Sequence, residues 1–213
     1  MRFILLDIIY PTHCAACGDI IEPGQKFCKD CKSELEFIKI KQYKNKNNKF
    51  DRLISVFCYK DAAKRVVLRY KFHGKKYLYK TMAEYMFREF EENYDDINFD
   101  YITNIPMSFS EYMNRGFNQT KVLAKALSRK TKIKYKKLLR KKFSTKNQVG
   151  LTAKERAENL KGCFENTENI KGKTILLVDD VKTTGATLNE CSKVLRKAGA
   201  KGIYCITFAM ADE

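Results

Sequence analysis

The sequence predicts an α/β protein with a mainly parallel sheet that is flanked by helices. Short apolar runs alternate along the chain with longer segments whose apolar residues recur at helical spacing. One run, ILLV at 175–178, is continuously apolar, as is typical of a strand that is buried on both faces. Because strands that alternate with helices form parallel sheets, these observations together indicate the fold class.

The predicted elements follow one another in a regular order. Strands are expected at residues 53–59, 101–105, 174–178 and 203–210. Apolar residues at intervals of three and four predict helices at residues 62–72, 78–90, 119–127, 152–160 and 185–198. Thr152 and Glu155 form a capping-box pattern at the start of one helix, and Gly199 suits the end of the last.

Three regions are expected along the chain: an N-terminal helix and four-cysteine module at 1–38, a basic linker at 39–51, and the α/β domain at 52–213. The linker is polar and has no apolar period. The first ten residues are apolar but interrupted by Asp7, and no small-residue cleavage site follows, so we expect a short amphipathic helix rather than a signal peptide. With no run of about 20 apolar residues, no membrane insertion and a cytoplasmic location are expected.

Two cysteine pairs predict a metal site. Cys14 and Cys17 form one C-x-x-C pair, and Cys28 and Cys31 form the second after ten intervening residues. Four thiolates in tetrahedral geometry favour structural Zn²⁺ with no open coordination position. Disulfides and an iron–sulfur site are the alternatives, and a reducing compartment argues against disulfides. The other four cysteines lie in apolar segments and are expected in the core: Cys58, Cys163, Cys191 and Cys205.

A second motif, ILLVDDVKTTGAT at 175–187, predicts a strand, a loop and a helix that together hold a phosphorylated sugar or nucleotide. A helix N-terminus presents free N–H groups to an anion, and ligands bind at the carboxyl ends of parallel strands. Asp179 and Asp180 suit ribose hydroxyls or a cation carried by the ligand. A Walker A loop and a G-x-G-x-x-G fingerprint are both absent from the sequence.

The string VDDVKTTGAT resembles the ribose-phosphate loop of type I phosphoribosyltransferases, which binds 5-phosphoribosyl-1-pyrophosphate (PRPP) together with Mg²⁺. The resemblance implies that Asp179 and Asp180 contact the ribose 2- and 3-hydroxyls. It implies that the 5-phosphate is held by Thr183, Thr184, Gly185, Ala186 and Thr187.

Further motifs resemble the ComF family of competence-associated proteins over residues 3–210, nearly the whole chain. They are the four-cysteine module, the string RGFNQ at 115–119, and the spaced residues Gln148, Leu151, Arg156, Asn159 and Phe164. The family resemblance implies a phosphoribosyltransferase-like domain, a role in uptake and handling of single-stranded DNA, and a helicase of the same uptake system as a partner.

The same resemblance assigns the pyrophosphate side of the site. The turn after the 101–105 strand would meet pyrophosphate through Pro106, Met107 and Ser108, with Arg115 assisting. Residues 143–160 would form a hood with Arg156 as a charge clamp. The alternatives are a surface position for Arg115 and a local ion pair of Arg156 with Glu155 or Glu158.

The net charge of +17 is concentrated in one segment. Residues 129–146 contain ten Lys or Arg residues and no acid. Such a segment, with interleaved aromatic residues, is typical of nucleic-acid contact, although a solvated surface face is the alternative. The candidate DNA contacts are Lys136, Lys137, Arg140, Lys141 and Lys142.

Two functions follow from these motifs. The first is a PRPP-binding protein that acts in handling single-stranded DNA, with enzymatic turnover left open. The second is an active phosphoribosyltransferase of nucleotide metabolism with an unidentified acceptor. The sequence contains no signature for a catalytic base or an amine donor, which favours the first.

Overall fold

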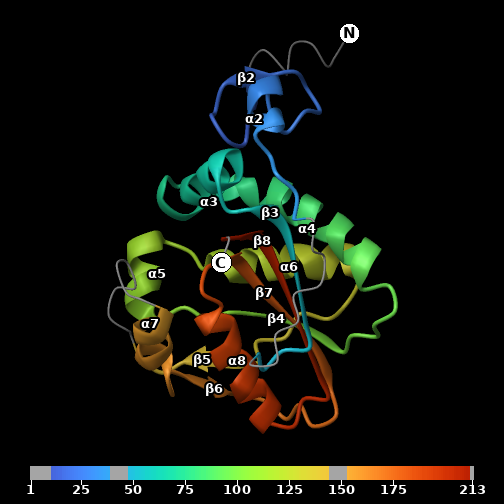
Figure 1. The fold of residues 1–213 in the computed structure, drawn as a ribbon, viewed down its shortest axis with the longest axis vertical. Helices are drawn as coiled ribbons and strands as arrows, with labels where there is room; N and C mark the ends of the chain where they lie inside the picture. The colour runs from blue at the N-terminus through green and yellow to red at the C-terminus, as the bar shows by residue number, and fades with distance from the viewer. Residues whose placement is uncertain (1–10, 39–47, 144–152, 212–213) are drawn as a thin grey trace.

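A four-stranded parallel sheet lies at the centre of the molecule (Figure 1), which confirms the predicted fold class. The structure is a computed structural model that describes residues 11–38, 48–143 and 153–211. The sheet has the order β3–β8–β7–β4. Its strands are β3 (Arg52–Cys58), β4 (Tyr101–Asn104), β7 (Thr174–Lys182) and β8 (Gly202–Met210).

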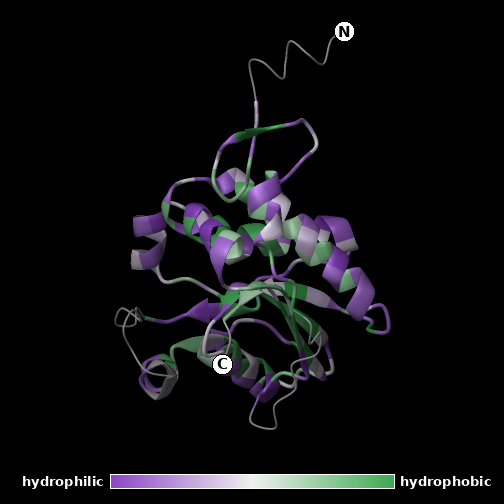
Figure 2. Ribbon diagram, turned by 45° about the horizontal axis from the view of Figure 1, so that its top comes forward, coloured by the Kyte–Doolittle hydropathy of each residue, from purple (hydrophilic) through white to green (hydrophobic). Residues whose placement is uncertain are grey.

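Helices cover both faces of this sheet, as Figures 1 and 2 show. One face carries α3 (Asp61–Phe72), α4 (Tyr79–Asn93) and α6 (Gln119–Thr131). The other carries α7 (Ala153–Leu160), α8 (Ala186–Lys197) and a small antiparallel pair of β5 (Leu139–Lys141) and β6 (Phe164–Asn166). A short 3-10 helix, η1 (Lys76–Leu78), precedes α4.

The continuously apolar strand β7 supplies both layers of the core. Leu176 and Val178 pack into the cluster beneath α3, α4 and α6, whereas Ile175 and Leu177 pack into the cluster beneath α8. Alternate side chains of a strand point to opposite faces, so burying both faces requires an uninterrupted apolar run. The predicted strand buried on both faces is therefore confirmed.

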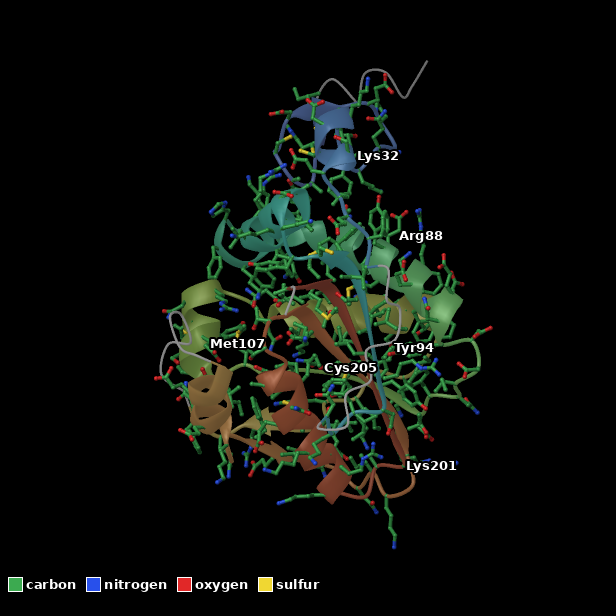
Figure 3. All side chains as sticks on the ribbon, in the orientation of Figure 1. Lys32, Arg88, Tyr94, Met107, Lys201 and Cys205 are labelled. Carbon is green, nitrogen blue, oxygen red and sulfur yellow. The ribbon has the colours of Figure 1, made fainter. Side chains whose placement is uncertain are left out.

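The four cysteines outside the two pairs are all buried, as predicted. Cys205 lies in the interior of the sheet (Figure 3), and its carbonyl accepts a hydrogen bond of 2.8 Å from the hydroxyl of Tyr94. Burial raises the pKa of the Cys205 and Cys191 thiols well above their ordinary values. Both therefore serve as core residues and stay protonated.

Strand β7 continues past the predicted end at residue 178. It pairs with β8 as far as Lys182 opposite Met210, so the backbone of Asp179 and Asp180 lies within the sheet. The prediction stopped early because two carboxylates are unusual in a buried strand. The extension places both carboxylates at the carboxyl end of the sheet, where the site is expected.

Several small elements were not predicted, among them the β5–β6 pair. The N-terminal module contains β1 (Thr12–His13), β2 (Ile20–Ile21) and α2 (Lys29–Ser33). A further unpredicted element is α5 (Phe109–Arg115), which begins with a capping box of Ser108 and Glu111 and buries none of its residues. Without a core-facing side, α5 has no apolar periodicity to reveal it.

Part of the predicted linker lies against the domain. The Lys49 N–H donates to Asn189 Oδ1 at 2.8 Å, and Asp51 forms an ion pair with Arg196 at 2.9 Å. Linker residues 39–47, the predicted helix at 1–10 and the capping residue Thr152 fall outside the described residues.

Candidate ribose-phosphate site and zinc module

The two carboxylates at the end of β7 are buried, with Asp179 only 9% and Asp180 only 4% exposed. Lys71, from the last turn of α3, places its Nζ 2.6 Å from Asp180 Oδ1. Burial lowers the pKa of Lys71, but the Asp180 carboxylate more than offsets this, so that pKa lies above its ordinary value. Lys71 is therefore a charged partner of the acidic pair.

Asp179 differs from its neighbour. Burial and the adjacent Asp180 charge raise the pKa of Asp179 to about 8, although the charges of Lys71 and Arg115 act in the opposite direction. Its Oδ1 accepts a hydrogen bond of 2.9 Å from the backbone N–H of Asp180. The site thus holds one carboxylate with a cationic partner and one that retains its proton near neutral pH.

The loop that follows leads into the N-terminus of α8. Gly185 is the residue before the helix and has a φ of 75°, a left-handed conformation that favours glycine. A Cβ at this position would lie 3.3 Å from Lys182 Cε, so the space is limited as well. Gly185 has no side chain that could cap α8, so N–H groups of the first turn of this helix can bind an anion.

Hydroxyl groups surround this helix N-terminus. Thr183 and Thr184 are exposed and Thr187 is half-buried, while Ala186 donates its N–H to Thr184 Oγ1 at 3.4 Å. The predicted 5-phosphate segment therefore combines backbone donors with hydroxyl donors at the carboxyl edge of the sheet. This arrangement suits a phosphate monoester.

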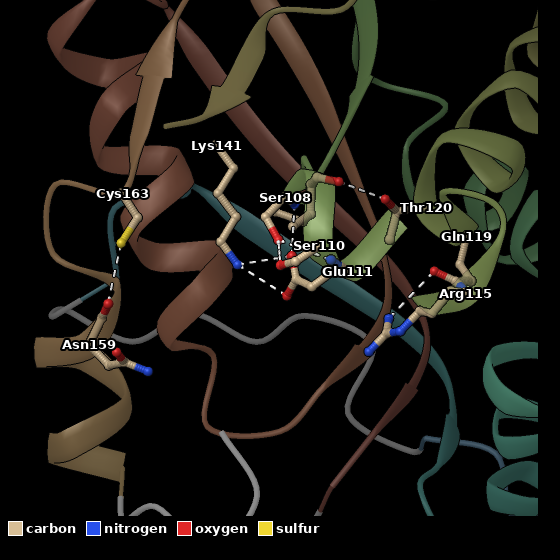
Figure 4. Close-up of polar contacts among 10 residues, drawn as sticks. Ser108, Ser110, Glu111, Arg115, Gln119, Thr120, Lys141, Asn159 and Cys163 are labelled. Atoms are coloured by element: carbon tan, nitrogen blue, oxygen red, sulfur yellow. Dashed lines mark hydrogen bonds and ion pairs between the residues drawn. The ribbon is translucent and has the colours of Figure 1, made fainter. Parts of the chain in front are cut away.

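The predicted pyrophosphate turn lies at the same edge. Pro106 and Met107 follow β4, and Ser108 caps α5 (Figures 3 and 4). Arg115 lies at the end of α5, with its Nη1 3.5 Å from Gln119 Oε1 and its guanidinium 5.3 Å from the ring centre of Phe72. The positive charge of Arg115 acts to lower the pKa of Asp179. The Arg156 side chain falls outside the described residues.

The four cysteines of the N-terminal module come together as predicted. All four sulfur atoms lie within 4.8 Å of one another, and Cys17 Sγ is 3.8 Å from Cys28 Sγ. Sulfurs at about 2.3 Å from a tetrahedral Zn²⁺ are separated by about 3.8 Å, so the thiols fit this ion. His13 is not part of the cluster, because its Nδ1 lies 2.8 Å from the carbonyl of Gly18.

Helix α3 joins the zinc module to the acidic pair. Arg65 Nη2 donates to Cys31 Sγ at 3.3 Å, and Arg69 Nη1 donates to the carbonyls of Cys14 and Ala15 at 2.8 and 2.9 Å. Two residues beyond Arg69, Lys71 contacts Asp180. The helix that supports the zinc ligands therefore also supplies the cation of the candidate site.

The basic segment is partly neutralised by acids from elsewhere in the chain. Of the five predicted DNA contacts, three form ion pairs: Lys136 with Glu168, Arg140 with Glu165, and Lys141 with Glu111. Lys142 lies 5.9 Å from the ring centre of Phe143. Because these charges are paired, residues 129–146 offer fewer positive charges to a ligand than the sequence alone indicates.

Comparison with protein-family models gives two matches. A double zinc ribbon domain matches residues 5–42, and a phosphoribosyl transferase domain matches residues 119–212. The first match and the four-thiol geometry together support structural zinc.

Several known proteins are similar over most of the chain. Competence protein F of Haemophilus influenzae is 29% identical over 93% of this chain and 85% of its own length. Competence protein ComFC of Streptococcus pneumoniae is 36% identical over 70% of this chain and 64% of its own length. The chain belongs to the ComF family. It also matches the DNA utilization protein YhgH of Escherichia coli, at 32% identity over 50% of this chain and 48% of that protein's length.

Sequence reasoning missed two features of this ComF family chain. The Ser108-x-x-Glu111 pattern is a capping box that signals α5, and it could have been found. The Lys71–Asp180 pair joins residues that lie far apart in the sequence, and no local pattern marks it.

None of the helices within the described ranges combines the length and the apolar character that crossing a bilayer requires.

The raised pKa of Asp179 predicts how stability depends on pH. A carboxyl whose pKa rises on folding contributes stability below its unfolded pKa, near 3.9, and this contribution is lost as the pH rises through about 8. Asp179→Asn removes the titrating group, so we expect its gain in free energy of unfolding over the wild type to be larger at pH 9 than at pH 6, by roughly 2–3 kcal/mol. Urea unfolding of both proteins at both pH values measures this, and an equal effect at pH 6 and pH 9 would contradict it.

Proposed function

We propose that the chain binds PRPP with Mg²⁺ at the end of β7 and acts in the handling of single-stranded DNA during competence. The observation that carries the PRPP assignment is the buried acidic pair, followed directly by the loop that leads into the N-terminus of α8 at Gly185. In this assignment Asp179 and Asp180 bind the ribose hydroxyls. The 5-phosphate lies against residues 183–187, and the pyrophosphate against Ser108 and Arg115.

The surroundings of the acidic pair support a ligand that carries its own cation. Lys71 balances Asp180, and Asp179 is protonated near neutral pH in the absence of ligand. A Mg²⁺ ion bound with the ligand beside Asp179 and Asp180 would supply the positive charge that favours the ionised form of Asp179. PRPP supplies the ribose, the 5-phosphate and the pyrophosphate that these groups suit.

The role in DNA handling rests on relatives and on charge. The similar proteins are named competence proteins and a DNA utilization protein. The chain carries a net charge of +17, which favours a polyanionic partner. A helicase of the uptake system is the expected protein partner of this role.

Thermal unfolding tests the PRPP assignment. PRPP with Mg²⁺ at 100 times its Kd should stabilise the wild-type protein by about 2.7 kcal/mol and raise its Tm. The variant with Asp179→Asn and Asp180→Asn should show no rise. A second adjacent pair, Asp95 and Asp96, is exposed in the loop after α4 and offers the matched control, since its double Asn variant makes the same charge change away from the site. An equal Tm rise in both double variants would refute the assignment.

Turnover is measured separately. Pyrophosphate release from PRPP in the presence of bases, amines and oligonucleotides distinguishes an active transferase from a binding protein. Release that depends on one of these acceptors, and that is lost in the Asp179 and Asp180 variant, would establish transfer.

A further inference from the structure

A cavity of about 520 Å³ lies beside the candidate site, at the carboxyl end of β4. Its walls come from α5, the first turns of α6 and residues 135–141. It shares Pro106, Met107 and Ser108 with the predicted pyrophosphate turn but contains neither Asp179 nor Asp180. We refer to it as the α5–α6 groove. Its volume is in the range of cavities that hold small ligands or single nucleotides.

The charge of the groove is positive and largely uncompensated. Lys121, Lys125 and Lys137 line it, and all three are exposed. None of the three forms an ion pair with another described residue, and none of the lining residues is acidic. This sets them apart from Lys136, Arg140 and Lys141, whose charges are paired. An anionic ligand would therefore meet unpaired cations in the groove.

Aromatic rings line the same groove. Phe109 is 79% exposed and Tyr112 is 47% exposed, and both come from α5, which buries none of its residues. Polar contacts hold α5 in place: Glu111 accepts from the Ser108 N–H at 2.7 Å and pairs with Lys141 at 3.1 Å (Figure 4). A helix that is fixed by polar contacts and presents two rings to a cationic groove offers a stacking surface rather than a core surface.

We propose that the α5–α6 groove binds single-stranded nucleic acid, with bases stacked on Phe109 and Tyr112 and phosphates held by Lys121 and Lys137. This proposal rests on the proposed function in DNA handling. Most of the proposed contacts lie outside the basic segment at residues 129–146 that the sequence indicates for nucleic-acid contact. Unpaired bases expose the faces that stack on aromatic rings, whereas a duplex hides them, so single strands are favoured. Because the groove adjoins the pyrophosphate turn, a bound strand would lie next to the ribose-phosphate site.

Salt-dependent binding of a fluorescent oligothymidylate to the full chain tests the phosphate contacts. The slope of log K against log salt falls by about 0.7 for each phosphate contact that is lost on a single strand. The double variant Lys121→Gln with Lys137→Gln should therefore lower the slope by about 1.4. A control with Lys171→Gln and Lys197→Gln makes the same charge change at exposed positions, just before β7 and at the end of α8, and should leave the slope unchanged.

A second series tests stacking. Phe109→Leu keeps the apolar bulk but removes the ring, and should weaken binding roughly tenfold. Phe109→Tyr keeps the ring and should bind like the wild type. Because Phe109 is exposed, each variant should keep the wild-type Tm, which is measured alongside.

The outcomes separate the groove from the wider function. If the wild type binds but both groove variants match their controls, the groove assignment is overturned and the role in DNA handling stands. If the wild type does not bind oligothymidylate even at about 50 mM salt, both are overturned. Competition by polyglutamate as effective as that by unlabelled oligothymidylate would instead assign the groove to an acidic protein.

Discussion

Replacing Cys14 with serine should abolish stoichiometric zinc and unfold the N-terminal module. Structural zinc sites contribute about 10–16 kcal/mol of binding free energy, which exceeds the net stability of an ordinary domain. Cys14, Ala15 and Phe27 also belong to the same buried cluster as residues of α3 and α4. The loss should therefore extend beyond the module, because Arg69 bonds the carbonyls of Cys14 and Ala15.

Metal analysis and urea unfolding measure this effect. The wild type should contain one zinc per chain, and Cys14→Ser none. His13→Gln is the matched control: His13 lies next to Cys14 and outside the sulfur cluster, so its variant should keep its zinc. Zinc retained by Cys14→Ser at the wild-type level would show that the four thiols do not form the site.

Replacing Lys71 with methionine should be the most damaging single change at the candidate ligand site. Asp180 is 4% exposed, so removing its partner leaves a buried carboxylate uncompensated. Breaking a buried ion pair by removing one partner costs about 3–5 kcal/mol. The Lys71 side chain is 20% exposed, so we expect the lower end, about 3 kcal/mol at pH 7.

A double-mutant cycle identifies the cause of this loss. Asp180→Asn added to Lys71→Met removes the unpaired charge and should recover much of the lost stability. Lys64→Met changes an exposed lysine of the same helix and should change the free energy of unfolding by less than about 0.5 kcal/mol. Equal free energies of unfolding for Lys71→Met and Lys64→Met would show that the ion pair does not stabilise the fold.

The main features of the fold could be predicted because each depends on the pattern of residues within a short stretch of sequence. The apolar run of β7 and the helical spacing of α3 reveal buried surfaces directly. The zinc site is similar, since each C-x-x-C pair places its two ligands within one turn. By contrast, α5 buries nothing and has no apolar pattern, so only its capping box marks it.

The charges of the candidate site could not be predicted, because they depend on contacts between distant segments. Lys71 meets Asp180 only after α3 packs on the sheet. In the same way, Glu165 and Glu168 neutralise part of the basic run after β6 pairs with β5. A charge run in a sequence shows which charges exist, whereas the fold decides which remain unpaired.

Calorimetric titration of the zinc-containing protein with PRPP tests the central claim, that the end of β7 and the start of α8 bind a ribose phosphate. We predict saturable binding of one PRPP per chain that requires Mg²⁺, weaker binding of ribose 5-phosphate, and no binding to the variant with Asp179→Asn and Asp180→Asn. The Asp95→Asn and Asp96→Asn control should bind like the wild type. PRPP binding of equal affinity in both double variants, or no binding to the wild type, would contradict the claim.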